Sequence, residues 1–291
     1  MNIMSQGLRR SGTTILFDIL SEDSRFCSFY EPLCRGGTSV GGGSGAKSKD
    51  VMRSLRAARD EYSLFNNIDQ SLGPFNFGAP KDYNLEVFRG KCTREIELYL
   101  DFLLGYGENC LLKFTRATFM IRNLYRLDRN AVFIHIEKNP ARWVMSHIFK
   151  RNYNAPAARD SDMFFKINTG YNMWSQGSIS DAFLKRKNRK LLSRPGYFKL
   201  LYIWHAFNRI IESDGRKFYG DKYLKVSNER LCENPRDIIM SIYNLADMEH
   251  DESVISWAEE NLRPPREILF ADDERWHEAF DEIGIDKKYL V

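Results

Sequence analysis

The sequence of 291 residues predicts an α/β fold, a three-layer sandwich in which helices cover both faces of a central, mostly parallel sheet. Three observations support this prediction. Short apolar segments alternate along the chain with longer segments of helical period. Residues 131–136 are apolar at every position except His135, as expected of a central parallel strand that is covered on both faces. A glycine-containing turn joins the first apolar segment to the first periodic one. We therefore expect right-handed strand–helix–strand units in one domain over residues 1–291.

The first apolar segment runs into the turn Gly7-Leu8-Arg9-Arg10-Ser11-Gly12-Thr13-Thr14 and then into a predicted helix that ends near Leu20. Glycines let such a turn point its backbone N–H groups inward, and the N-terminus of a helix adds free donors and a partial positive charge. The two threonines add hydroxyl groups and the two arginines add charge. The stretch is therefore predicted to bind phosphate, and a plain turn between a strand and a helix is the alternative.

A second predicted strand, 25–30, leads to Glu31 and Pro32. Because proline cannot continue a strand ladder, Glu31 is expected at the carboxyl end of the strand, the edge where open parallel sheets bind ligands. A carboxylate there is a candidate general base, and a solvated surface glutamate is the alternative. Residues 36–50, rich in glycine and serine, are predicted to form a flexible loop, with a substrate lid as the alternative.

The rest of the chain continues the alternation. Further strands are predicted at 110–116, 131–136 and 223–227. Further helices are predicted at 50–65, 93–106, 117–127, from 141 onward, 200–211 and 235–246, with a helical C-terminal part. Residues 66–92 show no regular pattern, and residues 152–193 show no clear period. We interpret 152–193 as an insertion that could shape an acceptor site.

Composition narrows the classes of function. A hydrophobic content of 43% with 28% charged residues is ordinary for a globular protein, and a formal net charge of +4 with scattered basic residues does not favour nucleic acid as a partner. A local basic pocket for a small anion fits better. No apolar stretch approaches the ~18 residues of a membrane span, and the N-terminus begins a strand, so we expect a cytoplasmic protein. The five cysteines lack metal-ligand spacing and are expected as free thiols, with a Cys27–Cys34 bridge as the alternative.

The spacing Gly7-x4-Gly12 matches the frame of a nucleoside-triphosphate P-loop, in which Lys and then Ser or Thr should follow. Here Thr13 stands at the lysine position, and the cation has moved to Arg10 inside the loop. Arg10-Ser11-Gly12-Thr13-Thr14 in this setting resembles the 5′-phosphosulfate loop of sulfotransferases, which take a sulfuryl group from 3′-phosphoadenosine-5′-phosphosulfate (PAPS).

Three later stretches strengthen the resemblance. Lys138-Asn139-Pro140, with Ser146 eight residues after Lys138, is similar to the 3′-phosphate segment of the family, although the family usually has Arg at the first position. The Lys138 ammonium keeps the charge but loses the bidentate fork of a guanidinium. Glu31-Pro32-Leu33 resembles a stretch of carbohydrate-type members, and residues 223–235 resemble the family's late strand with Glu-Asp-Leu and a downstream proline. The C-terminal fifty or so residues and the insertion match nothing in the family.

The resemblance implies a P-loop nucleotide-hydrolase-like fold and transfer of a sulfuryl group from PAPS to a hydroxyl or amine acceptor, leaving adenosine 3′,5′-bisphosphate (PAP). It implies these nucleotide-binding residues: Gly7, Arg9, Arg10, Ser11, Gly12, Thr13, Thr14, Lys138 and Ser146. Arg10 and Lys113 would stabilise the charge that develops on the leaving phosphate, and Glu31 would act as the base. No metal is demanded, because the sulfuryl group carries little charge.

Several alternatives stay open. In one branch of the family a histidine base follows two residues after the lysine at the Lys113 position, and here Thr115 takes its place, so His147 is the alternative base while His135 is expected in the core. Trp143 or a later aromatic residue could contact adenine. A PAP-binding pseudoenzyme and a P-loop kinase are the rival functions. The acceptor, which could be a carbohydrate, lipid or peptide hydroxyl, and the oligomeric state are not determined by the sequence.

Overall fold

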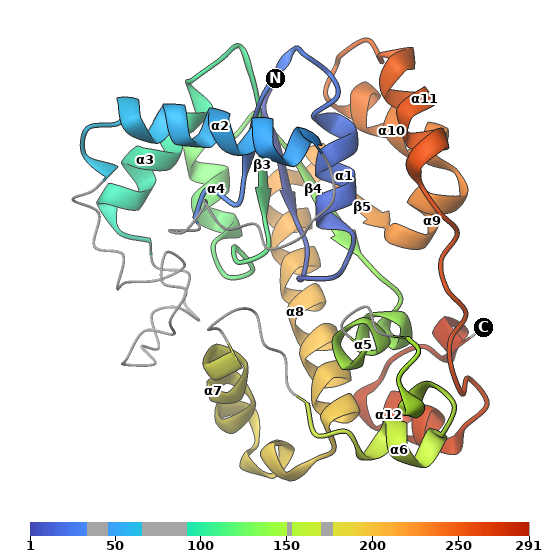
Figure 1. The fold of residues 1–291 in the computed structure, drawn as a ribbon. Helices are drawn as coiled ribbons and strands as arrows, with labels where there is room; N and C mark the ends of the chain where they lie inside the picture. Colours follow the sequence, from blue (N-terminus) through green and yellow to red (C-terminus); the bar gives the residue numbers. More distant parts are fainter. Residues whose placement is uncertain (34–45, 66–91, 150–152, 170–176, 291) are drawn as a thin grey trace.

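The computed structural model describes residues 1–33, 46–65, 92–149, 153–169 and 177–290. A five-stranded sheet runs through its centre in the order β2-β3-β1-β4-β5, and every neighbouring pair is parallel (Figure 1). The strands are β1 (Ile3–Gln6), β2 (Phe26–Tyr30), β3 (Asn109–Phe114), β4 (Val132–Glu137) and β5 (Tyr223–Ser227). The predicted α/β class is confirmed, and all five carboxyl ends lie at one edge of the sheet.

The register fixes which predicted residues meet at this edge. β1 lies between β3 and β4, so Ser5 is opposite both Lys113 and Ile134. The strand order reverses at β1, since one crossover leads from it toward β2 and later ones lead toward β4 and β5. Such a reversal leaves a crevice beyond the carboxyl end of the strand, because the two connections leave in opposite directions.

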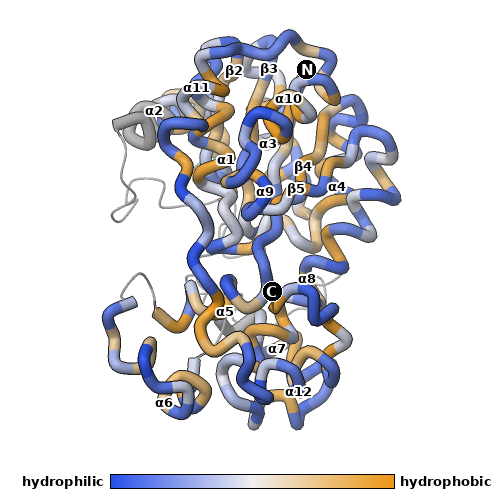
Figure 2. The backbone as a smooth tube through the Cα atoms, turned by 90° about the vertical axis from the view of Figure 1, so that its right-hand side faces the viewer, coloured by the Kyte–Doolittle hydropathy of each residue, from blue (hydrophilic) through white to orange (hydrophobic). Residues whose placement is uncertain are grey.

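Helices pack on both faces of the sheet. One buried cluster joins β1, β3, β4 and β5 to α1 (Thr13–Leu20), α10 (Pro235–Leu245) and α11 (Glu252–Asn261). The larger cluster covers the opposite face, where it joins the sheet to α2 (Ala46–Glu61), α3 (Arg94–Leu104), α4 (Ile121–Leu127) and α8 (Gly196–Tyr219). Hydrophobic stretches run through the strands and recur along these helices, whereas outer loops are hydrophilic (Figure 2).

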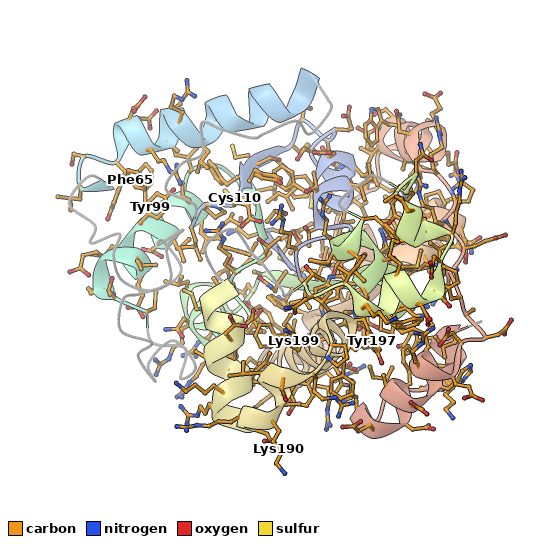
Figure 3. The ribbon with its side chains drawn as sticks, turned by 60° about the horizontal axis from the view of Figure 1, so that its bottom comes forward. Phe65, Tyr99, Cys110, Lys190, Tyr197 and Lys199 are labelled. Atoms are coloured by element: carbon orange, nitrogen blue, oxygen red, sulfur yellow. The ribbon has the colours of Figure 1, made fainter. Side chains whose placement is uncertain are left out.

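A lower group of helices lies beyond the carboxyl edge of the sheet, and the long α8 connects it to the sheet layer (Figure 1). The group contains α5 (Pro140–Ile148), α6 (Ser161–Lys166), α7 (Gly177–Lys187) and α12 (Glu274–Ile283). Trp276 of α12 is fully buried against Phe165 and against Tyr197 at the start of α8. Tyr197 is labelled in Figure 3, which shows the molecule with its bottom turned forward. The remaining elements are α9 (Asn228–Glu233) and the 3₁₀ turns η4 (Pro156–Ala158), η5 (Arg189–Ser193), η6 (Gly220–Lys222) and η7 (Lys287–Leu290).

The structure differs from the predicted element boundaries in several places and adds detail to the insertion. The loop predicted at 36–50 includes the first turn of α2, which begins at Ala46 because the glycine tract ends at Gly45 and Ala and Lys are good helix formers. Its part at 36–45 lies outside the described residues, as does most of the irregular segment 66–92. The insertion at 152–193 contains α6 and α7, whose few turns give too short an apolar pattern to show a period. α8 extends well beyond the predicted 200–211.

Candidate active site

The loop between β1 and α1 has a backbone that requires glycine at two positions. A Cβ atom on Gly7 would stand 2.3 Å from the carbonyl oxygen of Ile136 in β4. Gly12 has a φ of 91°, and a Cβ atom there would stand 2.1 Å from the Asn228 amide nitrogen at the start of α9. The glycines therefore let the loop approach two neighbouring elements more closely than any other residue would.

Arg10 and Glu31 both carry backbone strain. Four non-glycine residues of the described chain have positive φ, and these two, at 74° and 48°, are among them. A left-handed backbone at such residues costs on the order of 1 kcal/mol and persists only where the surrounding structure enforces it, often at functional sites. Two independently predicted catalytic residues thus share a feature that the sequence did not show.

The loop also holds groups that suit an anion. Gly12 caps α1 without a side-chain hydrogen bond, and the first turn of the helix contains no acidic residue. The Ser11 hydroxyl is buried, and its oxygen has no hydrogen-bond partner among the described residues. Burying a hydroxyl without a partner is costly, so a ligand oxygen at this place would relieve the cost. Arg9 and Arg10 are half-buried, Thr13 is buried, and exposed Thr14 lies 3.1 Å from the Tyr30 hydroxyl.

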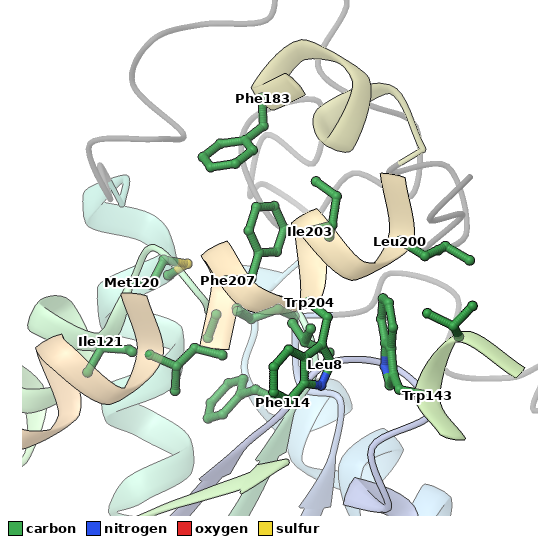
Figure 4. Close-up of a cluster of buried hydrophobic side chains, with 14 of the residues drawn as sticks. Leu8, Phe114, Met120, Ile121, Trp143, Phe183, Leu200, Ile203, Trp204 and Phe207 are labelled. Carbon is green, nitrogen blue, oxygen red and sulfur yellow. The ribbon is translucent and has the colours of Figure 1, made fainter. Parts of the chain in front are cut away.

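Trp143 in α5 packs against the Gly7–Thr14 loop. Its indole N–H donates to the backbone oxygen of Arg9 at 2.9 Å, and its ring centroid lies 4.1 Å from that of His147. Figure 4 shows Trp143 on α5 near Leu8, the loop residue that lies in the core together with Phe114. Because Trp143 is fully buried, its ring faces are covered by protein. The expectation that it contacts adenine is therefore replaced by a structural role in holding the loop.

The second predicted anion site follows β4. The Asn139 side chain caps α5 by accepting from the Arg142 N–H at 3.1 Å, and Pro140 occupies the first turn. This start of the helix leaves Lys138 half-buried at the strand end. Two residues that sequence reasoning missed hold the segment. The Glu229 carboxylate accepts from the Asn139 N–H at 3.1 Å, and the Trp204 indole donates to the Lys138 carbonyl at 2.9 Å. Glu229 lies two residues after the end of β5, in the first turn of α9, and this position near a strand end is the signal that could have found it.

The two predicted anion sites lie close together, since Gly7 approaches the carbonyl oxygen of Ile136, two residues before Lys138, and Trp143 of α5 binds the Arg9 carbonyl. Burial lowers the pKa of Lys138, and the positive charges of Arg142 and Arg10 lower it further while Glu229 opposes them. Burial also lowers the pKa of His147 to about 3, with contributions from the charges of Arg9, Arg10 and Lys138. Arg10 and Lys138 thus act on each other and on the same imidazole. The Ser146 hydroxyl, one residue before His147, donates to the Trp143 carbonyl at 2.6 Å.

Glu31 and Lys113 form a buried pair on the other side of β1. The Lys113 ammonium lies 2.7 Å from a Glu31 oxygen and 4.1 Å from the centre of the Tyr30 ring. The carboxylate also accepts from the Thr115 N–H at 3.2 Å and from the Thr115 hydroxyl at 2.5 Å. Thr115, the residue found where the family resemblance expects histidine, therefore binds the candidate base.

The pair sets the ionisation of both groups. Burial alone would raise the pKa of Glu31, but the charges of Lys113 and Arg116 and the hydrogen bonds from Lys113 and Thr115 hold it below its usual range. Burial would lower the pKa of Lys113, yet Glu31 and Tyr30 raise it. Both groups are therefore charged at neutral pH. Burial instead lowers the pKa of His135 to about 4, and both of its ring nitrogens are bonded within the core, to Tyr223 and Asn208, as expected.

The structure thus brings the loop, Lys138 and Ser146 together beside β1 and β4, and places Glu31 and Lys113 beside β2 and β3 at the same sheet edge. Cys27, Cys92, Cys110 and Cys232 are free thiols, whereas Cys34, the partner in the alternative bridge, lies outside the described residues. Among the helices described, none combines the length and the apolar character needed to cross a membrane.

Comparisons with known proteins give weak likenesses. No family model matches the chain, and no curated protein matches it. The sulfotransferase domain of the olefin synthase of Synechococcus PCC 7002 is similar at a TM-score of 0.42 and 18% identity, over 87% of this chain and 76% of that one. The sulfotransferase STF9 of Mycobacterium avium is similar at a TM-score of 0.49 and 13% identity, over 97% and 75%. At these values neither likeness supports a conclusion about activity.

Proposed function

We propose that the chain is a sulfotransferase that moves a sulfuryl group from PAPS to a hydroxyl or amine acceptor by in-line transfer. The observation that supports this most is the closeness of the Gly7–Thr14 loop to the Lys138 segment. Gly7 packs against the Ile136 carbonyl, two residues before Lys138, and the Arg9 carbonyl accepts from Trp143 of the helix that follows Lys138. A nucleotide with phosphates at both ends of its ribose has the matching charge distribution.

The residues present fit the donor. The uncapped start of α1, the buried Ser11 hydroxyl and the hydroxyls of Thr13 and Thr14 would hold the 5′-phosphosulfate, with Gly7, Arg9 and Gly12 shaping the loop. Lys138 and Ser146 would hold the 3′-phosphate. PAPS supplies an activated sulfuryl group and a phosphate leaving group. Arg10 and Lys113 are the cations suited to stabilise the charge that develops on that phosphate.

On the acceptor side, we assign proton removal to Glu31. A base must be deprotonated before it can accept a proton, and the neighbouring cations keep Glu31 ionised. The same cations weaken it as a base, so acceptance of the proton needs Lys113 to move toward the leaving group as the transfer proceeds. His147, the alternative base, is buried and has a much lowered pKa, which makes it the weaker candidate.

A binding protein without chemistry is the second candidate. Its specific support is the hydrogen bonding of Glu31. The carboxylate already accepts three hydrogen bonds from Lys113 and Thr115, which occupy the oxygens that an acceptor hydroxyl would need. We also propose a reducing compartment such as the cytoplasm, because the four described cysteines are free thiols.

Thermal melting tests nucleotide binding. PAP at about 100 times its Kd, without metal, should stabilise the protein by about 2.7 kcal/mol. ATP with magnesium should give a smaller shift, and the opposite order would favour a kinase. Incubation with labelled PAPS and a panel of hydroxyl and amine acceptors, analysed by mass spectrometry, then separates the two candidates. Sulfated product supports the enzyme, whereas PAP binding without any product supports the pseudoenzyme.

A further inference from the structure

A run of exposed cations ends α7 and begins the turn that follows it. Five of the six residues at 185–190 are basic, and all five side chains are exposed: Lys185, Arg186, Lys187, Arg189 and Lys190. The chain has 43 lysines and arginines against 39 acidic residues, so without these five the acidic residues would outnumber the basic ones by one. Five of the 43 basic residues are thus concentrated in six consecutive positions.

The five cations are not neutralised locally. Within the part of the chain that the structure describes, no ion pair is formed by any of them, and the Lys187 ammonium lies 5.6 Å from the centre of the Phe183 ring. Nearby Arg194, by contrast, makes a double hydrogen bond to Glu282 at 2.5 and 2.7 Å. Clustered like charges without counter-charges raise the local potential and attract a polyanionic partner.

An exposed apolar side chain accompanies the cations. Leu192 lies two residues after Lys190 in the same segment and keeps 38% of its surface exposed. In Figure 3 Lys190 extends from the lower rim of the molecule, away from the ribbon. Cations for headgroups and an apolar side chain for the acyl boundary are the two features of a segment that binds a lipid surface.

We propose that residues 185–192 dock the protein onto a membrane surface that contains anionic lipid. The anionic headgroups are bound by the five basic side chains, and Leu192 inserts at the boundary between the headgroups and the acyl chains. None of these residues is assigned to the proposed nucleotide site, and the inference goes beyond the proposed transferase function without depending on it.

Vesicle sedimentation tests the proposal. The protein should bind vesicles of phosphatidylserine and phosphatidylcholine but not vesicles of phosphatidylcholine alone, and binding should disappear at about 0.5 M salt because salt screens the attraction. Replacing the five basic residues together (Lys185→Gln, Arg186→Gln, Lys187→Gln, Arg189→Gln and Lys190→Gln) should weaken binding at least about tenfold. Leu192→Ser alone should weaken it by about threefold.

A control of equal charge removes five exposed cations from α4, the turn after it and α8 (Arg122→Gln, Arg126→Gln, Arg129→Gln, Arg209→Gln and Lys217→Gln) and should leave binding within about twofold of the parent. All variants are first checked for an unchanged melting curve, and sedimentation is measured only on those that melt like the parent. The proposal is overturned if the parent binds no vesicles, if it binds phosphatidylcholine alone equally well, or if both five-residue variants lose binding equally. Capture by dextran sulfate without binding to vesicles would also overturn it, in favour of a soluble polyanion.

Discussion

Individual residues of the loop decide whether the crevice can do chemistry. Arg10 combines a cation that the sequence indicated with a positive φ of 74° that only the structure showed. The sequence could identify the cation because its place between two glycines departs from a nucleoside-triphosphate loop. It could not show the strain, since the backbone angle of one loop residue depends on how the whole loop packs, which no local pattern contains.

Arg10→Ala should lower sulfuryl transfer by about 10² or more, because the charge on the leaving phosphate loses its cation. Arg10→Gly is the matched variant, since glycine adopts the positive φ without strain. It should be as inactive as the alanine variant and at least as stable as the parent in urea unfolding. A folded Arg10→Ala protein with parental turnover would contradict the assigned role.

Glu31→Gln should abolish most turnover and leave PAP affinity nearly unchanged, because the amide cannot take a proton and Glu31 is assigned to the acceptor rather than to the nucleotide. The same change leaves the buried Lys113 charge uncompensated and should cost about 3 kcal/mol of stability. Glu31→Gln combined with Lys113→Met should recover part of this stability but no activity. Turnover at the parental rate in Glu31→Gln would place the base elsewhere.

The Glu31–Lys113 pair also predicts how stability depends on pH. The folded pKa of Glu31 lies below its ordinary value of 4.5, so its contribution is complete above that value and is lost as the pH falls through the lowered folded pKa. The folded pKa of Lys113 is raised above 10.5, so its contribution is complete below that pH and is lost above the raised value. The free energy of unfolding in urea should be measured for the parent and for the Glu31→Gln, Lys113→Met double variant. The difference between the two free energies should be constant between pH 4.5 and pH 10.5 and should fall outside that range. A difference that stays constant into strong acid would contradict it.

At the scale of elements, strand ends and helix caps place the binding groups. Lys138 and Ser146 have their positions because α5 begins at Pro140 with Asn139 as its cap. The eight-residue spacing was visible in the sequence, since it needs only one strand end and two turns of helix. The contacts that this segment makes with Glu229, Trp204 and the Arg9 carbonyl were not visible in the sequence, because each partner comes from a distant part of the chain.

Asn139→Ala removes the cap of α5 and should destabilise the protein by about 1 kcal/mol. If the cap positions Lys138, the affinity for PAP should fall more than the affinity for inorganic sulfate, which needs only the Gly7–Thr14 loop. Asn234→Ala, at the start of α10 where the side chain makes no capping bond, is the matched control and should change neither quantity appreciably. Equal losses for PAP and sulfate would remove the connection between this cap and the second anion site.

At the scale of the whole molecule, one buried cluster extends from Met4 in the sheet to Trp276 and Phe280 in α12. We therefore propose that residues 1–291 form a single domain. Calorimetry should show one transition whose calorimetric and van't Hoff enthalpies agree. Two transitions, one of them moved by PAP and the other not, would separate the lower helices from the sheet as a second domain.

The sequence by itself determined the α/β class, the order of the strands along the chain and the loop and strand ends that carry the proposed binding groups, because apolar period and glycine spacing are local properties. Only the tertiary structure decided that Trp143 is a buried support, that Thr115 and Lys113 hold Glu31, and that the cations at 185–190 have no counter-charge among the described residues. Each of these depends on contacts between residues far apart in the chain, and the energy of burying or pairing a group is set by those neighbours, which no local pattern contains.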